Sequence, residues 1–182
     1  AASQTPSQSF DGNSSSGAWA SVIDWYSSGT YTGANTTGSY SGEWIQIDIG
    51  TTVVLDNLKI YPGHNATYIP KTMRLFYSSN GSTWTQGVDW TNLTADDDWK
   101  PSGNWTPVTK TGLSLTGRYF RLVVNETTGG AYALISEIEL YGYVGSTSFT
   151  LIDLLVTYLS RISCIRFPIS NESACEFENT SF

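Results

Sequence analysis

The chain of 182 residues is long enough for one domain with a hydrophobic core and a short additional segment. Charged residues make up 14% of it and aromatic residues another 14%, a combination typical of extracellular β proteins and not of disordered chains or cytosolic enzymes. The net charge is −7 and the nine Lys and Arg residues form no cluster, which argues against binding to nucleic acid and against insertion into anionic membranes.

Residues 1–43 are rich in Ser, Gly, Thr and Asn, which predicts turns around short strands. Apolar and polar residues then alternate from 44 to 49, and this period of two predicts a strand that ends at Gly50. The same reasoning predicts strands at 53–60, 73–77, 117–124 and 133–142. Asn80-Gly81 predicts a hairpin turn, and residues 86–107 form a long polar stretch. Many short strands without a long helical period indicate an antiparallel sandwich or jelly roll, with Trp44 and Trp84 in its core.

The pattern changes after residue 143, which divides the chain into a main domain, 1–143, and a C-terminal segment, 144–182. Residues 151–165 carry Leu and Ile at helical spacing and predict one short amphipathic helix. Its apolar face requires a cover, which its own domain, another subunit or a membrane surface could provide. Cys164 and Cys175 are predicted to form a local disulfide, as is usual for a close pair in a secreted chain.

Nine of the ten asparagines lie in Asn-x-Ser/Thr sequons, which mark surface loops of chains that pass through a glycosylating secretory pathway. A start at Ala-Ala-Ser-Gln, without Met, suits a mature N-terminus after removal of a signal peptide. We therefore expect a secreted, heavily N-glycosylated protein. The predicted glycosylation sites are Asn13, Asn35, Asn65, Asn80, Asn92, Asn104, Asn125, Asn171 and Asn179.

Five short motifs follow one another: F-D-G-N at 10–13, W-I-Q-I-D-I-G at 44–50, L-F-Y-S-S-N-G-S-T-W at 75–84, G-R-Y-F-R-L at 117–122 and I-S-E-I-E-L-Y-G at 135–142. In sequence and order they resemble the motifs of discoidin domains, also called coagulation-factor C-type domains, to which family 32 carbohydrate-binding modules are similar. The resemblance covers residues 1–143 and implies an all-β, discoidin-like antiparallel β-sandwich. The disulfide that ties the two ends of coagulation-factor members has no counterpart here.

The resemblance also implies a structural Ca²⁺ ion where the two ends of the domain meet. The residues that match its ligands are Asp11, Asn13, Ser21 and Glu137. Carboxylate, hydroxyl and carbonyl oxygens are the ligands that a hard cation prefers. In the alternative interpretation, Asp11 caps a turn and Glu137 pairs with an arginine.

Members of this family bind their ligands through loops at one end, which correspond here to 24–34, 62–70, 86–106 and 125–132. Sugar recognition needs a flat apolar face for the ring and fixed polar groups for its hydroxyls. The candidate ligand residues in these loops are Trp25, Tyr26, Tyr31, His64, Tyr68, Trp99 and Tyr132. Trp25-Tyr26 also resembles the aromatic tips that enter membranes in clotting-factor members, a use against which the acidic charge argues.

The resulting hypothesis is a non-enzymatic module for carbohydrate recognition or adhesion at a cell or matrix surface, with a carbohydrate or a glycoprotein as partner. One histidine, no thiol in the main domain and no Gly-rich phosphate loop argue against an enzyme. Five sequons lie in or beside the ligand loops, which favours an alternative. In that alternative the chain is a structural glycoprotein of an extracellular or virion-surface assembly and self-associates through residues 149–167.

Overall fold

The computed structural model describes residues 4–99 and 106–144, without the side chains of Asp96 and Asp97. Several predictions concern residues outside this part: the amphipathic helix, self-association through 149–167, the disulfide and three sequons. They involve Cys164, Cys175, Asn104, Asn171 and Asn179, and they stay predictions.

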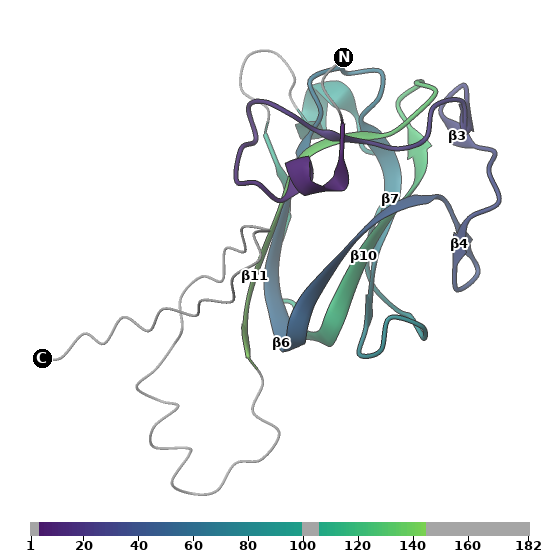
Figure 1. Ribbon diagram of the computed structural model, residues 1–182. Helices are drawn as coiled ribbons and strands as arrows, with labels where there is room; N and C mark the ends of the chain where they lie inside the picture. The colour runs from purple at the N-terminus through teal and green to yellow at the C-terminus, as the bar shows by residue number, and fades with distance from the viewer. Residues whose placement is uncertain (1–3, 100–105, 145–182) are drawn as a thin grey trace, which may run out of the picture.

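Strands dominate the described chain, which confirms the predicted all-β class (Figure 1). One short 3-10 helix, η1, precedes the strands, and one turn of π-helix, η2, lies between β8 and β9. The first part holds only two-residue strands, as predicted: β1 (Trp19–Ala20), β2 (Tyr26–Ser27), β3 (Thr30–Tyr31), β4 (Thr36–Thr37) and β5 (Tyr40–Ser41). The remaining elements are η1 (Pro6–Ser9), β6 (Glu43–Pro62), β7 (Pro70–Ser78), β8 (Thr85–Trp90), η2 (Ala95–Trp99), β9 (Val108–Lys110), β10 (Leu115–Thr127) and β11 (Leu134–Val144).

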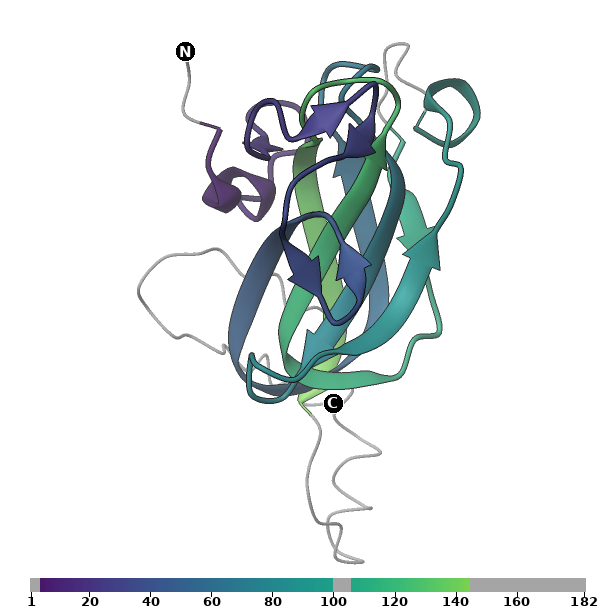
Figure 2. The ribbon, with the colours of Figure 1, turned by 90° about the vertical axis from the view of Figure 1, so that its right-hand side faces the viewer.

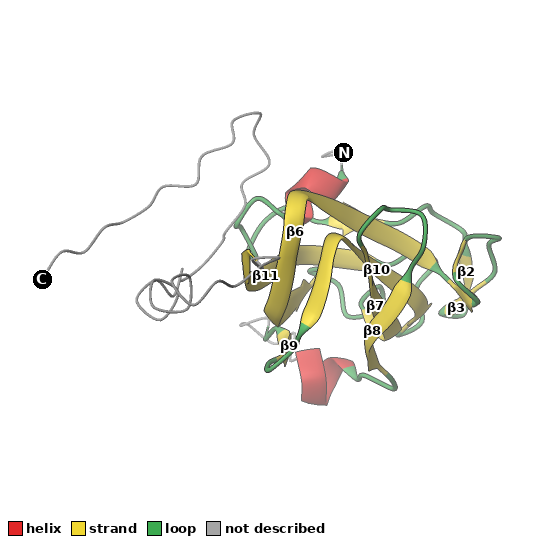
Figure 3. Ribbon diagram, turned by 90° about the horizontal axis from the view of Figure 1, so that it is seen from below, coloured by secondary structure: helices red, strands yellow, loops and turns green. Residues whose placement is uncertain are grey.

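The long strands form two antiparallel layers that share β6 and enclose the core (Figure 3). The first half of β6 pairs with β10, which pairs on its other edge with β7, and β7 pairs with β8. The second half of β6 pairs with β11 and β9, and β1 extends the edge of β11. This arrangement is the predicted discoidin-like sandwich.

Strand β6 replaces the two strands predicted at 44–49 and 53–60. Gly50 has a φ of +83°, a conformation that favours glycine, and its amide donates to Asp48 Oδ1 at 2.8 Å. The chain bends there and pairing with β10 resumes at Val53, opposite Gly117. Glycine therefore turns the strand from one layer into the other without ending it.

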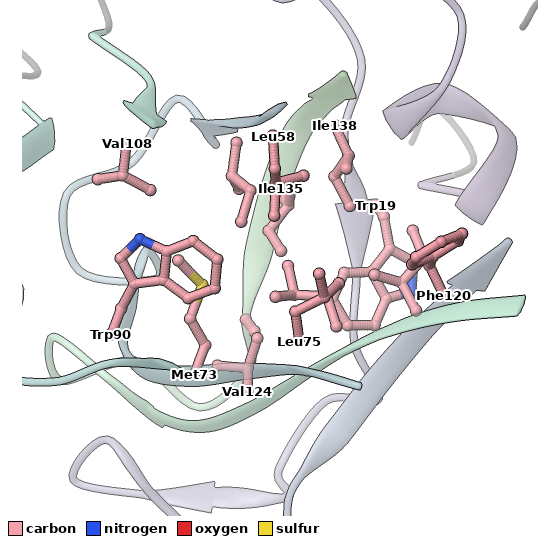
Figure 4. Packing of buried hydrophobic residues seen from close by; sticks show 14 of the residues in the cluster. Trp19, Leu58, Met73, Leu75, Trp90, Val108, Phe120, Val124, Ile135 and Ile138 are labelled. Atoms are coloured by element: carbon pink, nitrogen blue, oxygen red, sulfur yellow. The ribbon is translucent and has the colours of Figure 1, made fainter. Parts of the chain in front are cut away.

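The core lies between the layers and is filled by the inward side chains of alternating positions (Figure 4). Leu58 of β6, Met73 of β7, Val124 of β10 and Ile135 of β11 are all fully buried. Trp90, at the end of β8, is also buried, although the sequence placed it in a polar stretch.

The outer face of the first layer carries an arginine between two tryptophans. The Arg121 guanidinium lies 4.1 Å from the ring centroids of both Trp44 and Trp84, and it donates hydrogen bonds to Gln46 and to Thr37 of β4. The β4–β5 hairpin thus lies across this face (Figure 2). The core prediction was wrong for Trp44, which is 38% exposed, and for Trp84, which is half-buried on the same outer face. Trp44 shares its side of β6 with Gln46 and Asp48, the polar side.

Candidate functional site

Three loops meet at the end of the barrel where β6 and β10 finish and β7 and β11 begin: 21–26, 63–69 and 128–133 (Figure 1). Backbone hydrogen bonds join them. Tyr26 N donates to Ala131 O at 3.3 Å, Gly130 N donates to Thr67 O at 2.7 Å, and Leu134 N donates to Tyr68 O at 2.8 Å. The loop 128–133 therefore ties the other two together, so the surface is formed before any ligand arrives.

A pair of stacked tyrosines lies in this surface. The rings of Tyr68 and Tyr132 are 4.1 Å apart and 10° from parallel, and both side chains are half-buried. Gly130 packs closely against the Tyr68 ring, since a Cβ there would come within 2.0 Å of Tyr68 Cδ1. Burial raises the pKa of Tyr132, and the neighbouring Tyr68 adds to the effect. At neutral pH the Tyr132 hydroxyl is therefore an uncharged donor and acceptor. His64 is exposed in the same loop as Tyr68.

A second group of aromatic residues packs the loop 21–26 against β3. Trp25 is half-buried and packs edge-on against Tyr31 at 6.3 Å, and Tyr31 packs in the same way against Tyr26 at 5.4 Å. Tyr26 and Tyr31 are buried, and the Tyr26 hydroxyl donates to Val124 O at 2.8 Å. Burial raises the pKa of both tyrosines.

The seven predicted ligand residues thus fall into two groups. Trp99 is completely buried and donates through Nε1 to Pro70 O at 2.9 Å, so it supports the loops together with Tyr26 and Tyr31. The side chains that reach the surface are Trp25, His64, Tyr68 and Tyr132.

The structure adds residues that sequence reasoning missed. Val22 is 49% exposed and Ile23 is 63% exposed, beside Trp25, which enlarges the apolar surface of this loop. The sequence feature that could have predicted this surface is the pair of adjacent apolar residues between Ser21 and Asp24, which belongs to no alternating strand pattern. Below the same loops, the buried carboxylate of Glu43 accepts hydrogen bonds from Asn35 Nδ2 at 2.6 Å and from the Tyr31 hydroxyl at 3.3 Å. Its position at the start of a strand gave no sign of this role.

The predicted calcium residues lie where the first loop meets β11. Glu137 is only 3% exposed, and its carboxylate accepts from the amides of Gly12 and Asn13 at 3.1–3.2 Å. Asp11 Oδ1 accepts from the Asn13 amide at 2.8 Å, as in the alternative in which Asp11 caps a turn. Ser21 lies farther along: its hydroxyl accepts from the Ala133 amide at 2.9 Å. The hydroxyls beside Asn13 are instead those of Ser16, which accepts from Asn13 Nδ2 at 2.6 Å, and of Ser15, which donates to Asn13 Oδ1 at 2.8 Å.

This cluster fits a hard cation in its chemistry. Burial raises the pKa of Glu137 to about 7; the Gly12 amide opposes this effect and the Asp11 charge adds to it. Two amide donors use only part of the acceptor capacity of a carboxylate. An ionised Glu137 beside Asp11 therefore has unused oxygen lone pairs and uncompensated charge, which a divalent ion would neutralise. Within 4–99 and 106–144, however, no three His, Cys, Asp or Glu side chains form a metal-binding group, so backbone and hydroxyl oxygens would have to complete the shell.

The fold is thus an antiparallel sandwich whose loops are joined at one end by backbone hydrogen bonds. Residues 1–138 match the family model described as F5/8 type C domain, and the chain belongs to that family. Human neuropilin-1 is 30% identical over 104 residues, which are 55% of this chain and 11% of neuropilin-1. The chain thus spans a small part of that relative. None of the helices among the described residues is long and apolar enough to cross a membrane.

Solved structures show the same fold. A CBM32 module of a family 31 glycoside hydrolase from Clostridium perfringens has a TM-score of 0.53 at 20% identity, covering 79% of this chain and 87% of the module. The chitosan-binding module 1 of a chitosanase/glucanase from Paenibacillus sp. IK-5 has a TM-score of 0.54 at 20% identity, covering 78% and 87%.

Proposed function

We propose that this domain is a non-catalytic carbohydrate-binding module whose ligand surface is the joined loop end. The observation that carries the proposal is the stacked pair of Tyr68 and Tyr132, half-exposed on two loops that hydrogen bonds hold together. The chitosan-binding relative supports the choice of carbohydrate as the ligand class.

The chemistry of the surface suits a sugar. A pyranose has one face of C–H groups, for which aromatic rings and the side chains of Val22 and Ile23 offer apolar contact. Its hydroxyls need fixed donors and acceptors, which His64 and the uncharged Tyr132 hydroxyl supply. Because hydrogen bonds fix the loops beforehand, binding orders little of the chain and loses little entropy.

The proposal also includes the location of the protein, its glycosylation and a bound ion. The excess of sequons supports an extracellular, N-glycosylated protein, and Asp11, Asn13 and Glu137 support a Ca²⁺ ion that would hold the first loop on β11. The sequons in and beside the ligand loops remain the observation that favours the structural-subunit alternative, and its self-association segment, 149–167, lies outside the described residues.

Binding to a panel of immobilised glycans tests this function, with amino-sugar, neutral-hexose and uronate ends represented. The enzymatically deglycosylated chain is expected to bind at least one class, and the double variant Tyr68→Ala/Tyr132→Ala is expected to lose that signal. Absence of binding by the deglycosylated protein to every class, in calcium and in chelator, would overturn the proposal.

A further inference from the structure

The sequons among the described residues are not equivalent in the fold. Asn35 and Asn125 are half-buried, and their amide nitrogens donate to Glu43 and to Ser41 O. Four others are exposed: Asn13, Asn65, Asn80 and Asn92. Of these four, Asn65 alone lies within the three joined loops 21–26, 63–69 and 128–133; it follows His64 directly and lies three residues before Tyr68.

The local backbone fixes the Asn65 side chain. Asn65 Oδ1 accepts from the Thr67 amide at 3.0 Å, and Asn65 O accepts from the Tyr68 amide at 3.1 Å. The second bond closes a four-residue turn, which brings the Cα atoms of Asn65 and Tyr68 to within about 7 Å of each other. An N-linked glycan is attached through Nδ2, and the hydrogen bond from the Thr67 amide to Oδ1 holds this side-chain amide in one orientation.

A glycan on Asn65 would start beside the aromatic pair. Tyr68 follows in the same turn, and its ring lies 4.1 Å from that of Tyr132. The loop cannot easily swing the glycan away, because Gly130 N donates to Thr67 O and the Thr128 hydroxyl donates to Ala66 O. The first sugar rings therefore lie at the edge of the proposed ligand surface.

We infer that an N-glycan on Asn65 covers the Tyr68–Tyr132 surface, so that its presence or trimming sets how well the domain binds carbohydrate in solution. The inference rests on the proposed function for its ligand. The attached glycan offers the same C–H faces and hydroxyls as an external sugar, at a high effective concentration. If it covers the rings in about nine of ten conformers, the apparent affinity falls about tenfold.

A second exposed sequon, at the opposite end of the sandwich, provides a matched control. Asn80 is exposed in the turn after β7, and its Oδ1 accepts from the amides of Ser82 and Thr83 at 2.9 Å. The nine residues of β7 separate this turn from the loop 63–69 by roughly 25 Å. A glycan on Asn80 should therefore leave the ligand surface open.

The experiment removes each sequon at its third residue, which spares the asparagine and its turn. Thr67→Ala and Ser82→Ala remove the two sites, and Thr67→Ser keeps the site while changing the same side chain. All are made in a glycosylating host, with occupancy measured by mass spectrometry. The first readout is the rate of nitration of Tyr68 and Tyr132 by tetranitromethane. The second is affinity for the glycan that the deglycosylated protein binds.

We expect Thr67→Ala to nitrate faster at both tyrosines and to bind about tenfold more tightly than the unmutated glycoprotein. Thr67→Ser and Ser82→Ala should match the unmutated glycoprotein. Equal nitration rates and equal affinities in all four proteins would overturn the inference that the glycan covers the two tyrosines. An Asn65 that carries no glycan would overturn it as well. Failure of the deglycosylated protein to bind any sugar would instead remove the proposed function, and nitration alone would then decide whether the glycan covers the rings.

Discussion

The backbone amide of Gly12 donates to the carboxylate of Glu137, 125 residues away in the sequence. This contact joins the first loop of the domain to its last strand. The buried acid also lies near Asp11 and Glu139, whose like charges raise its pKa further. The first two predictions, on pH and on calcium, concern this carboxylate.

Stability without metal should fall as the pH rises through the titration of Glu137. Its pKa is raised from 4.5 to about 7, so the folded state favours the protonated carboxyl. Below pH 4.5 both states are protonated and there is no cost. Between 4.5 and 7 the unfolded chain ionises first, which costs the fold about 3 kcal/mol by pH 7 and above. Urea unfolding in chelator at pH 4.5 and pH 8 measures this change, and Glu137→Gln should remove it. Parallel pH profiles for the two proteins would contradict the prediction.

Calcium should offset the stability that the fold loses when Glu137 ionises. At about 100 times its dissociation constant the ion would add roughly 2.7 kcal/mol to the free energy of unfolding. Thermal melting with calcium or chelator measures the effect. Glu139→Gln is the matched control, because Glu139 lies on the same strand but pairs with Lys59 at 3.7 Å. The response should survive in Glu139→Gln and vanish in Glu137→Gln. Equal responses in both variants would place the ion elsewhere.

Loss of the Tyr132 ring should weaken carbohydrate binding more than loss of its hydroxyl. Tyr132→Ala removes the stacked face and should cost about tenfold in affinity, whereas Tyr132→Phe should cost less. Titration calorimetry on deglycosylated protein makes the comparison. Tyr119→Ala, beside Arg118 on the outer face of β10, serves as a control for surface aromatics and should bind normally. If Tyr119→Ala weakened binding as much as Tyr132→Ala, the loop end would not be the site.

Glycan occupancy should follow the hydrogen bonds of the asparagine amides. Asn35 Nδ2 is 2.6 Å from a Glu43 oxygen and Asn125 Nδ2 is 2.8 Å from Ser41 O, so a glycan on either would have to fit against the sheet. We expect low occupancy at both and high occupancy at Asn65 and Asn80. Enzymatic release in heavy-oxygen water, followed by peptide mass spectrometry, counts the modified sites. Full occupancy of Asn35 in folded, secreted protein would disprove this ranking.

Arg121 should matter to stability more than Arg118 does. Arg121 lies between two indoles and donates to Gln46 and Thr37, so Arg121→Lys loses stacking and paired hydrogen bonds, about 1–2 kcal/mol. Arg118 makes an exposed ion pair with Asp48, and Arg118→Lys should cost less than about 1 kcal/mol. Urea midpoints compare the two. A larger loss in Arg118→Lys would contradict the role given to the stacked guanidinium.

The strands of the main domain were predictable because side chains alternate along them. In β10, Phe120, Leu122 and Val124 face the core in the phase that the sequence shows. The same alternation placed Trp44 with the polar side of β6, but the size and hydrophobicity of the indole suggested the core. What the sequence could not show was the compensating contact, since Arg121 lies 77 positions away from Trp44.

The candidate site was less predictable than the fold. Loop residues have no periodicity, so Trp99, which is buried, and Tyr132, which reaches the surface, looked alike in sequence. Their exposure depends on which loop lies over which. That order is set by backbone hydrogen bonds, such as the one from Gly130 N to Thr67 O, between residues far apart in the chain. The resemblance to discoidin domains located the loops. Only the three-dimensional structure separates their buried aromatic residues from those that reach the surface.

Strand β6 runs through both layers as one 20-residue element that bends at Gly50. Neither layer can therefore separate from the other without breaking the ladder of a strand that belongs to both. Tension applied to the domain would therefore pass through β6 into both layers.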